Sequence, residues 1–275
     1  MSSWWEVYEF LAGTGFDLLL GAFAFLAGLV FGSFANLIVF RVPRGLSIAR
    51  PGSACPDCGQ RLKIRDLVPV LSQLFLRSRC RYCGARFSWN YLVIELSCAA
   101  LFVAMLWFSG FSLAAVPLMM LGFALLCIAT IDAKTQEIPD GLIIFTAAIG
   151  VAWVALSALG LIPGAPSWYN ALLGALAGFA PLFILDRIVI LIYKKDGFGY
   201  GDMKLMAAAG LFLGWQNALL ALGFGFLLAA VQVVWLAAKK RAKRGIYIAF
   251  GPALCGGILL ALWFGAGFID MLFGW

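Results

Sequence analysis

Residues 91–131 read YLVIELSCAALFVAMLWFSGFSLAAVPLMMLGFALLCIATI, two long apolar runs separated by the short break at 110–112. A bilayer core about 30 Å thick needs about 20 consecutive apolar residues in a helix that crosses it. Each run approaches that length, and Glu95 is the only charged residue in either. The stretch therefore predicts two transmembrane helices, at 91–109 and 113–131, joined by a tight turn.

The same pattern recurs along the rest of the chain. Of its 275 residues, 64% are hydrophobic and 12% are charged, and the mean hydropathy is +0.99. A soluble domain cannot bury that much apolar surface. The sequence predicts an all-α polytopic membrane protein with about eight transmembrane helices. The predicted spans are 17–40, 91–109, 113–131, 141–162, 170–193, 203–216, 217–238 and 248–273.

Basic residues gather on one side of this map. Ten of the 20 Lys and Arg residues lie in the loop at 41–90, whereas 1–16, 110–112 and 163–169 contain none. Because Lys and Arg are retained on the cytoplasmic side of short loops, we expect a cytoplasmic 41–90 loop and both termini outside. The same bias accounts for the net charge of +7 without a nucleic-acid partner.

The 41–90 loop carries two CxxC pairs. Cys55-Pro-Asp-Cys58 and Cys80-Arg-Tyr-Cys83 are each followed by Gly. Four thiolates in two tight turns are the ligand set of a structural zinc site, and a reducing compartment disfavours disulfides. The alternative is four unrelated buried cysteines. A closed site of four cysteines would organise the loop rather than perform chemistry. The other three cysteines lie in predicted spans and are expected to be core residues: Cys98, Cys127 and Cys255.

These features divide the chain into three predicted parts. Residues 1–40 form an N-out first transmembrane segment, which is a retained anchor because no basic residue precedes it and Arg41 follows it. Residues 41–90 form a cytoplasmic zinc domain with four cysteine ligands. Residues 91–275 form a seven-helix transmembrane core.

Histidine is absent from the sequence, which limits the chemistry that the chain can perform. Ser-His-Asp and Cys-His hydrolysis, zinc metalloprotease sites and histidine acid–base catalysis all need an imidazole. Any catalysis must therefore rest on carboxylates, thiols or lysines.

Two aspartates stand out by their position. Asp132 ends the third span in CIATIDAKTQEIPD, and Asp202 lies in FGYGDMKLMAAAG, where Gly199 and Gly201 let the backbone approach closely. Both lie at the cytoplasmic membrane boundary. Two carboxylates in a partly dry site cannot both ionise easily, so one can activate water while the other polarises a scissile carbonyl, as in aspartic proteases. The alternative is that Asp202 caps its helix and Asp132 marks a helix end near lipid head groups.

Other charged residues have simpler interpretations. Asp186 and Arg187 lie about two turns inside the fifth span, where they pair or line a substrate path, unless Arg187 reaches the interface by itself. A further group of acidic residues is expected to be solvated: Asp57, Asp66, Glu137 and Asp196.

Six segments in order resemble the bacterial type IV prepilin leader peptidases, a family with a GxGD active-site motif and a methyltransferase activity. The segments are GSFANLIVFRVPR at 32–44, the paired CxxC motifs, YLVIELS at 91–97, IDAKTQEIPD at 131–140, GYGDMK at 199–204 and AFGPAL at 249–254. They cover nearly the whole chain.

The resemblance implies roles for individual residues. It makes Asp132 and Asp202 the catalytic aspartates, and it gives Glu95 and Asp140 structural or substrate-orienting roles. Gly199 and Gly201 join them as candidates along the substrate path. The implied zinc ligands are Cys55, Cys58, Cys80 and Cys83.

The resemblance also implies an activity and its partners. The chain would cleave the basic cytoplasmic leader from prepilins and pilin-like subunits of secretion or DNA-uptake systems, at the cytoplasmic face of the bacterial inner membrane. S-adenosylmethionine-dependent methylation of the new N-terminus would follow.

The chain departs from the family pattern in the loop that the resemblance links to methylation. Leu67-Val68-Pro69 replaces Asn-Ile-Pro, Gln73 replaces a tryptophan, and Ser78 replaces a glycine two positions before the third cysteine. Outside that loop, Ala249 replaces a proline. A peptidase without methyltransferase activity is therefore one alternative. A non-catalytic membrane assembly scaffold and a transporter with an acidic pair on its ion path are the others.

Overall fold

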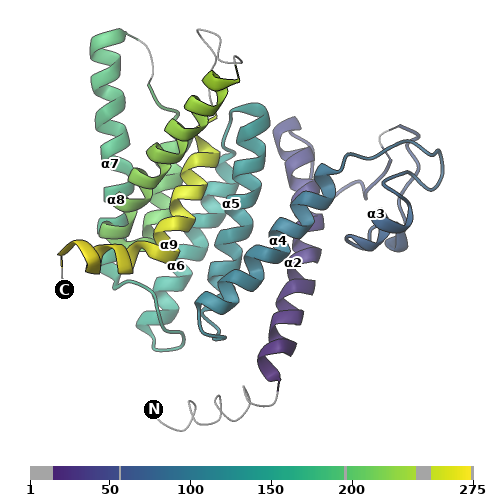
Figure 1. The fold of residues 1–275 in the computed structure, drawn as a ribbon, viewed down its shortest axis with the longest axis horizontal. Helices are drawn as coiled ribbons and strands as arrows, with labels where there is room; N and C mark the ends of the chain where they lie inside the picture. The colour runs from purple at the N-terminus through teal and green to yellow at the C-terminus, as the bar shows by residue number, and fades with distance from the viewer. Residues whose placement is uncertain (1–14, 56, 195–196, 240–248, 274–275) are drawn as a thin grey trace. The chain divides into compact units, whose positions relative to one another are not determined.

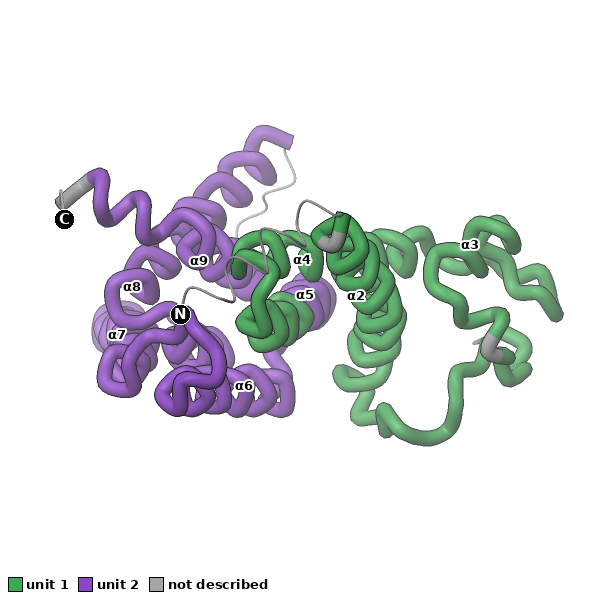
Figure 2. Tube along the Cα trace, turned by 90° about the horizontal axis from the view of Figure 1, so that it is seen from below, with its two compact units in different colours: residues 1–123 green, residues 124–275 purple. Residues whose placement is uncertain are grey.

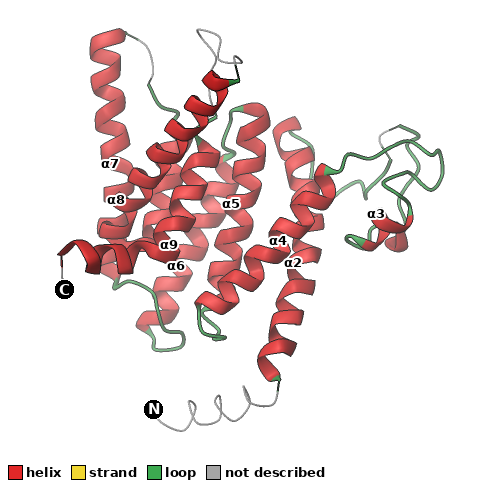
Figure 3. Cartoon of the chain, in the orientation of Figure 1, coloured by secondary structure: helices red, strands yellow, loops and turns green. Residues whose placement is uncertain are grey.

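The computed structural model describes residues 15–55, 57–194, 197–239 and 249–273. Over these ranges the regular elements are helices, with no β-strand, which confirms the all-α prediction (Figures 1 and 3). The chain divides into two compact units, 1–123 and 124–275 (Figure 2). The three-part division predicted from the sequence stays a prediction.

The first unit is built on two long helices, α2 (Phe16–Arg41) and α4 (Asn90–Phe108). Glycines on α2 let the two backbones touch: a Cβ on Gly28 would lie 2.5 Å from the Cα of Ala99, and one on Gly32 would lie 2.6 Å from the Cα of Glu95. Small residues at such crossings are typical of helix packing in membranes. Between them lie η1 (Val42–Arg44), η2 (Ile64–Asp66) and α3 (Leu71–Phe75).

The second unit begins within α5 (Ala115–Thr135), which starts in the first unit. It continues with α6 (Asp140–Ala158), α7 (Trp168–Tyr193), α8 (Tyr200–Ala238) and α9 (Gly251–Phe273). Glycines again set the closest approach, because a Cβ on Gly178 would overlap the Met206 carbonyl and one on Gly210 would overlap the Gly174 carbonyl. These pairs make α7 antiparallel to the first part of α8.

Helix α8 is broken at Gly214. The φ of 72° and ψ of 173° at this residue are not helical. The first arm, 200–213, lies against α7. The second arm, 215–238, runs antiparallel to α9, since Asn217 lies beside Gly265 and Gly225 lies beside Leu254. The Asn170 side chain of α7 accepts a hydrogen bond from the Trp215 N–H at 3.1 Å, which satisfies a donor freed by the break.

This break explains how the predicted spans map onto the helices. Seven helices of the described residues are long and apolar enough to cross a membrane, and α8 is one of them. Its 39 residues would extend about 58 Å as one straight helix, about twice a bilayer core. The sixth and seventh predicted spans are its two arms, and the boundary lies at Gly214 rather than at 216–217. The protein is thus a multi-pass membrane protein.

Candidate active site and metal centre

Asp132 is held at the end of α5 by the start of α9. Its carboxylate accepts a hydrogen bond from the Gly251 N–H at 2.8 Å, and the residue is 5% exposed. The first N–H groups of a helix have no partner within the helix, and they carry partial positive charge that favours a carboxylate. A Cβ on Gly251 would lie 2.7 Å from the Asp132 Oδ2 atom, so the contact requires glycine.

Asp202 lies in the first turn of α8, behind the extended residue Gly199. A Cβ on Gly199 would lie 3.3 Å from the Asp202 Oδ2 atom, and one on Gly201 would lie 2.9 Å from the Cβ of Ile138. Ile138 belongs to the segment that follows Asp132 in the chain. Gly201 therefore lets the start of α8 pack against the segment that follows Asp132, and Gly199 leaves room for the Asp202 carboxylate.

The two aspartates lie close enough for their charges to repel when both are ionised. Cys255, which lies one turn into α9 and is buried, is near both carboxyl groups. The end of α5, the start of α8 and the start of α9 thus meet around one carboxyl pair. This is the arrangement that general acid–base hydrolysis of a peptide bond requires.

Asp140 forms an ion pair with Lys204, whose Nζ lies 2.8 Å from its Oδ1 atom. The aspartate begins α6, and the lysine lies on α8, two residues beyond Asp202. Both side chains of the pair are exposed, so its contribution to stability is small. The pair does link Asp140, at the end of the segment that follows Asp132, to the GYGDMK motif that contains Asp202.

Glu95 belongs to the other compact unit, where it anchors the 41–90 loop to α4. Its Oε2 atom accepts the Val70 N–H at 2.7 Å, and the residue is 4% exposed. Val70 has φ 60° and ψ −54°, which is a strained conformation for a β-branched residue. The buried carboxylate helps to hold this turn in place.

The four loop cysteines form a compact cluster. One thiol sulfur from each of Cys55, Cys58, Cys80 and Cys83 lies within 4.8 Å of the others, and the Cys55 and Cys83 sulfurs are 3.8 Å apart. Tetrahedral zinc with Zn–S bonds of about 2.3 Å separates its sulfurs by about 3.8 Å. The residues fit a zinc ion.

Each knuckle closes through the glycine that follows its second cysteine. The Gly59 N–H donates to the Cys55 carbonyl at 2.9 Å, and the Gly84 N–H donates to the Cys80 carbonyl at 3.0 Å. Both glycines have positive φ, 69° and 74°, a conformation that other residues adopt at a cost. The repeated CxxCG pattern therefore encodes two equivalent turns.

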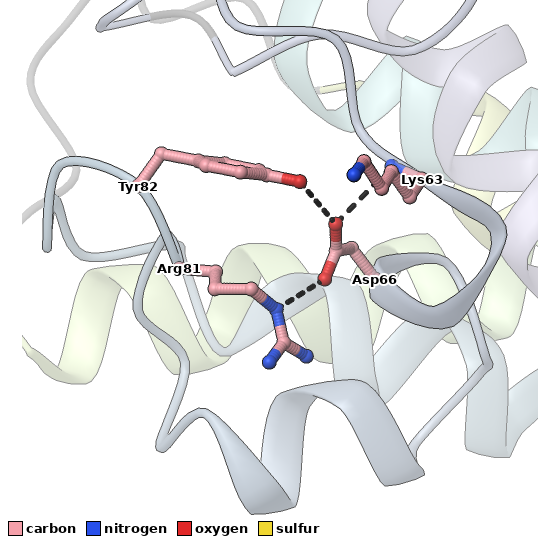
Figure 4. Close-up of polar contacts among 4 residues, drawn as sticks. All are labelled: Lys63, Asp66, Arg81 and Tyr82. Carbon is pink, nitrogen blue, oxygen red and sulfur yellow. Dashed lines mark hydrogen bonds and ion pairs between the residues drawn. The ribbon is translucent and has the colours of Figure 1, made fainter.

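Asp66 is not solvated, contrary to the expectation from the sequence. Its side chain is 2% exposed and accepts hydrogen bonds from Arg81 Nε at 2.6 Å, the Lys63 N–H at 3.1 Å and Tyr82 Oη at 3.2 Å (Figure 4). The Arg81 guanidinium holds the pKa of Asp66 below its usual value. Because Arg81 and Tyr82 lie inside the second CxxC pair, Asp66 ties η2 to that knuckle. Of the other acids expected to be solvated, Asp57 and Glu137 are exposed, and Asp196 lies outside the described residues.

Ser78 occupies a backbone conformation that suits glycine. Its φ is 54°, it is 4% exposed, and its hydroxyl has no hydrogen-bond partner among the described residues. Its N–H donates to the Gln73 carbonyl at 2.8 Å, and its carbonyl accepts the Phe87 N–H at 2.7 Å. The departure from the family glycine thus falls at a position whose backbone conformation favours glycine.

Sequence reasoning did not single out Gly251 as a site residue. The signal lay in AFGPAL at 249–254, since a Gly-Pro pair can begin a helix and leave a free N–H directed at a neighbour. The sequence could not predict that this N–H contacts Asp132, because the two residues are 119 positions apart in the chain.

Comparisons with known proteins match the chain to two family models. Residues 26–109 match the bacterial peptidase A24 N-terminal domain, and residues 118–234 match the type IV leader peptidase family. No solved structure matches the chain.

Several curated relatives carry the name prepilin leader peptidase/N-methyltransferase. The one from Klebsiella pneumoniae is 40% identical over 215 residues, covering 73% of this chain and 88% of the relative. The one from Bacillus subtilis (strain 168) is 36% identical, covering 90% and 95%. The one from Burkholderia pseudomallei (strain K96243) is 36% identical, covering 95% and 90%.

Proposed function

The chain belongs to the type IV leader peptidase family, and from this premise we propose that it removes the basic leader from type IV prepilins and pilin-like proteins and then N-methylates the new N-terminus. The observation that carries the peptidase assignment is the meeting of Asp132 and Asp202 at the junction of α5, α8 and α9, with Asp132 held by the Gly251 N–H. The chain is an enzyme whose hydrolytic machinery consists of carboxyl groups.

In the proposed reaction, Asp132 and Asp202 act as one unit that shares a proton. The ionised carboxylate takes a proton from water as the oxygen adds to the scissile carbonyl, and the protonated carboxyl donates a hydrogen bond to the carbonyl oxygen. The C–N bond of the tetrahedral intermediate then breaks, and the leaving nitrogen receives a proton from the pair. The Gly251 N–H orients one member of the pair throughout.

The depth of this pair suits a substrate that is itself a membrane helix. A prepilin has a basic cytoplasmic leader followed by an apolar helix, so it presents its scissile bond where apolar and polar solvents meet. Asp132 lies in the last turn of an apolar helix, and Asp202 lies in the first turn of another. The exposed carboxylates of Glu137 and Asp140 lie on the segment beside the pair, and a basic leader that displaces Lys204 from Asp140 would meet negative charge there. We assign Asp140 a substrate-orienting role on this basis.

The direct test is incubation of the purified protein with a prepilin, followed by mass spectrometry of the products. We expect two products cut at the end of the leader, and a mature product one methyl group heavier when S-adenosylmethionine is added. A scaffold or a transporter would leave the prepilin intact.

The proposed orientation places the active site at the cytoplasmic face of the bacterial inner membrane, with both termini outside. The distribution of Lys and Arg supports it. A cysteine introduced at Lys134 should react only with reagents that enter the cell, whereas one introduced at Gly164 should react with impermeant reagents added outside. External labelling at Lys134 would contradict the shared cytoplasmic face of the two aspartates.

The proposed cofactors are one structural zinc ion and S-adenosylmethionine as methyl donor. Zinc, when bound by the four cysteines, would fix the fold of the 41–90 loop. The loop residues would contribute to the methyltransferase site, and Ser78 is the position in it most open to a test.

Ser78→Gly is expected to raise methylation and leave proteolysis unchanged. Glycine removes an unpartnered buried hydroxyl and adopts φ 54° without strain, and the residue lies far in the chain from Asp132. The measurement is the methylated fraction of cleaved product, for wild type and variant, over a time course with methyl donor. Equal and complete methylation of both would show that the serine is neutral. If neither methylates, the changes at Leu67 and Gln73 become the next candidates, and the buried Oε1 of Gln73 also has no partner among the described residues.

A further inference from the structure

Asp186 is a buried carboxylate inside α7 that contacts the loop in front of the GYGDMK motif. It is 1% exposed, and its Oδ1 atom accepts hydrogen bonds from the Gly197 N–H at 3.0 Å and the Phe198 N–H at 3.1 Å. These two residues directly precede Gly199, behind which Asp202 begins α8. One side-chain oxygen therefore fixes the backbone that leads into the active site.

The other oxygen of the same carboxylate faces Arg187. The arginine NH2 atom lies 3.3 Å from Asp186 Oδ2 and donates a hydrogen bond to the Tyr200 hydroxyl at 2.6 Å. The sequence left open whether Asp186 and Arg187 pair, line a substrate path or separate, and the structure shows them paired. With both oxygens engaged, Asp186 has little capacity left to bind a substrate.

A cluster of three phenylalanines also holds this loop, through the side chain of Phe198. The Phe198 ring lies 5.7 Å from Phe250 and 6.0 Å from Phe226, and the last two rings are 5.4 Å apart. Phe250 directly precedes Gly251, the residue whose N–H binds Asp132. The cluster thus connects the loop before Asp202 to the group that orients Asp132.

We propose that Asp186 is a positioning residue for the peptidase reaction, which sets Asp202 relative to Asp132 by clamping the Gly197–Phe198 backbone against this aromatic cluster. The inference rests on the proposed function of the two aspartates. A buried acid within an apolar span is retained at a cost, and orientation of a catalytic segment is a reason to retain it.

The expected kinetic signature follows from this geometry. Asp186 engages backbone and arginine rather than substrate, so its loss should change the placement of Asp202 without changing how the prepilin binds. A misplacement of about 1 Å at a reacting group costs about 100-fold in rate. A defect confined to kcat is therefore expected, whereas a residue of the substrate path would raise KM.

Three variants test whether Asp186 acts by accepting hydrogen bonds from the loop backbone or through its negative charge. Asp186→Leu is similar in size but accepts no hydrogen bond, and it should lower kcat by about 10-fold or more with KM within about twofold. Asp186→Asn keeps an oxygen for both N–H groups and should retain most of kcat. The comparison variant is Arg187→Met, which keeps both hydrogen bonds that Asp186 Oδ1 accepts but removes the pairing on Oδ2 and the hydrogen bond to the Tyr200 hydroxyl. Its kcat defect should be smaller than that of Asp186→Leu, because the backbone contact is kept.

Two further measurements keep the inference testable if Asp186→Leu fails to fold. Phe198→Leu leaves Asp186 intact, loosens the same loop and should also lower kcat selectively. Hydrogen exchange followed by mass spectrometry should show the peptide covering 197–202 exchanging faster in Asp186→Leu or Phe198→Leu than in wild type, with other peptides unchanged.

The outcomes separate this inference from the function on which it rests. A wild-type protein that cleaves no prepilin overturns the proposed function, and the exchange of the 197–202 peptide still decides whether Asp186 clamps the loop. Unchanged kcat and unchanged exchange in the variants overturn the positioning role. A selective rise in KM, or an Asp186→Asn defect as large as that of Asp186→Leu, overturns it in favour of a substrate contact or a charge effect.

Discussion

Asp132→Asn and Asp202→Asn are each expected to reduce leader cleavage by about three orders of magnitude or more. The amide is nearly the size of the carboxylate but cannot exchange the proton that the reaction needs. Residues that act as one unit lose almost everything when either is removed, so the double variant should be little worse than each single variant. The measurement is the initial rate of leader release from a prepilin.

Both variants should remain folded. An asparagine at 132 keeps a side-chain oxygen for the Gly251 N–H, which the structure places 2.8 Å from the carboxylate. Asp57→Asn is the matched control, because Asp57 is exposed in the 41–90 loop and should tolerate the same change at full activity. Full cleavage by either active-site variant would refute the assignment of the pair.

Cys58→Ser and Cys80→Ser are expected to lose zinc and to loosen the 41–90 loop. Wild-type protein should contain one zinc per chain. Structural zinc sites supply about 10–16 kcal/mol of apparent binding free energy, which is available as folding energy. The loop has little regular structure to replace it: among its described residues this consists of two three-residue 3₁₀ helices and the five-residue α3.

Elemental analysis and limited proteolysis measure these two effects separately. Cys98→Ala is the matched control, because Cys98 is buried in α4 and should keep one zinc per chain when replaced. Retention of full zinc content by Cys80→Ser, or a wild-type content near zero in protein purified without chelator, would show that the four cysteines serve another purpose.

Much of the fold could be predicted because the membrane selects composition directly. A helix in lipid makes its backbone hydrogen bonds internally and needs an apolar run of sufficient length. The positions of the spans could therefore be predicted from the sequence. The break at Gly214 was less readable. The residue follows Leu213 and precedes Trp215 in an apolar run, and only the pairing of one arm with α7 and the other with α9 locates the reversal.

The residues of the candidate site were also readable, because their chemistry is rare in this sequence. With no histidine in the chain, Asp132 and Asp202 stand out at the ends of apolar runs, and the glycines at 199 and 201 mark a close approach. Their partners were not readable. The Asp66 side chain was expected in solvent and is instead enclosed beside Arg81, 15 residues away in the chain.

The sequence by itself determined that this protein lies in a membrane, the order of its spans and the residue types available for catalysis. It also contains a four-cysteine pattern typical of a metal site. Those properties depend on composition and local spacing. Only the tertiary structure decided that the Gly251 N–H meets Asp132 and that Asp186 holds the backbone before Asp202. Hydrogen bonds of this kind join residues from different helices, and their partners are chosen by how the helices pack, which no local pattern records.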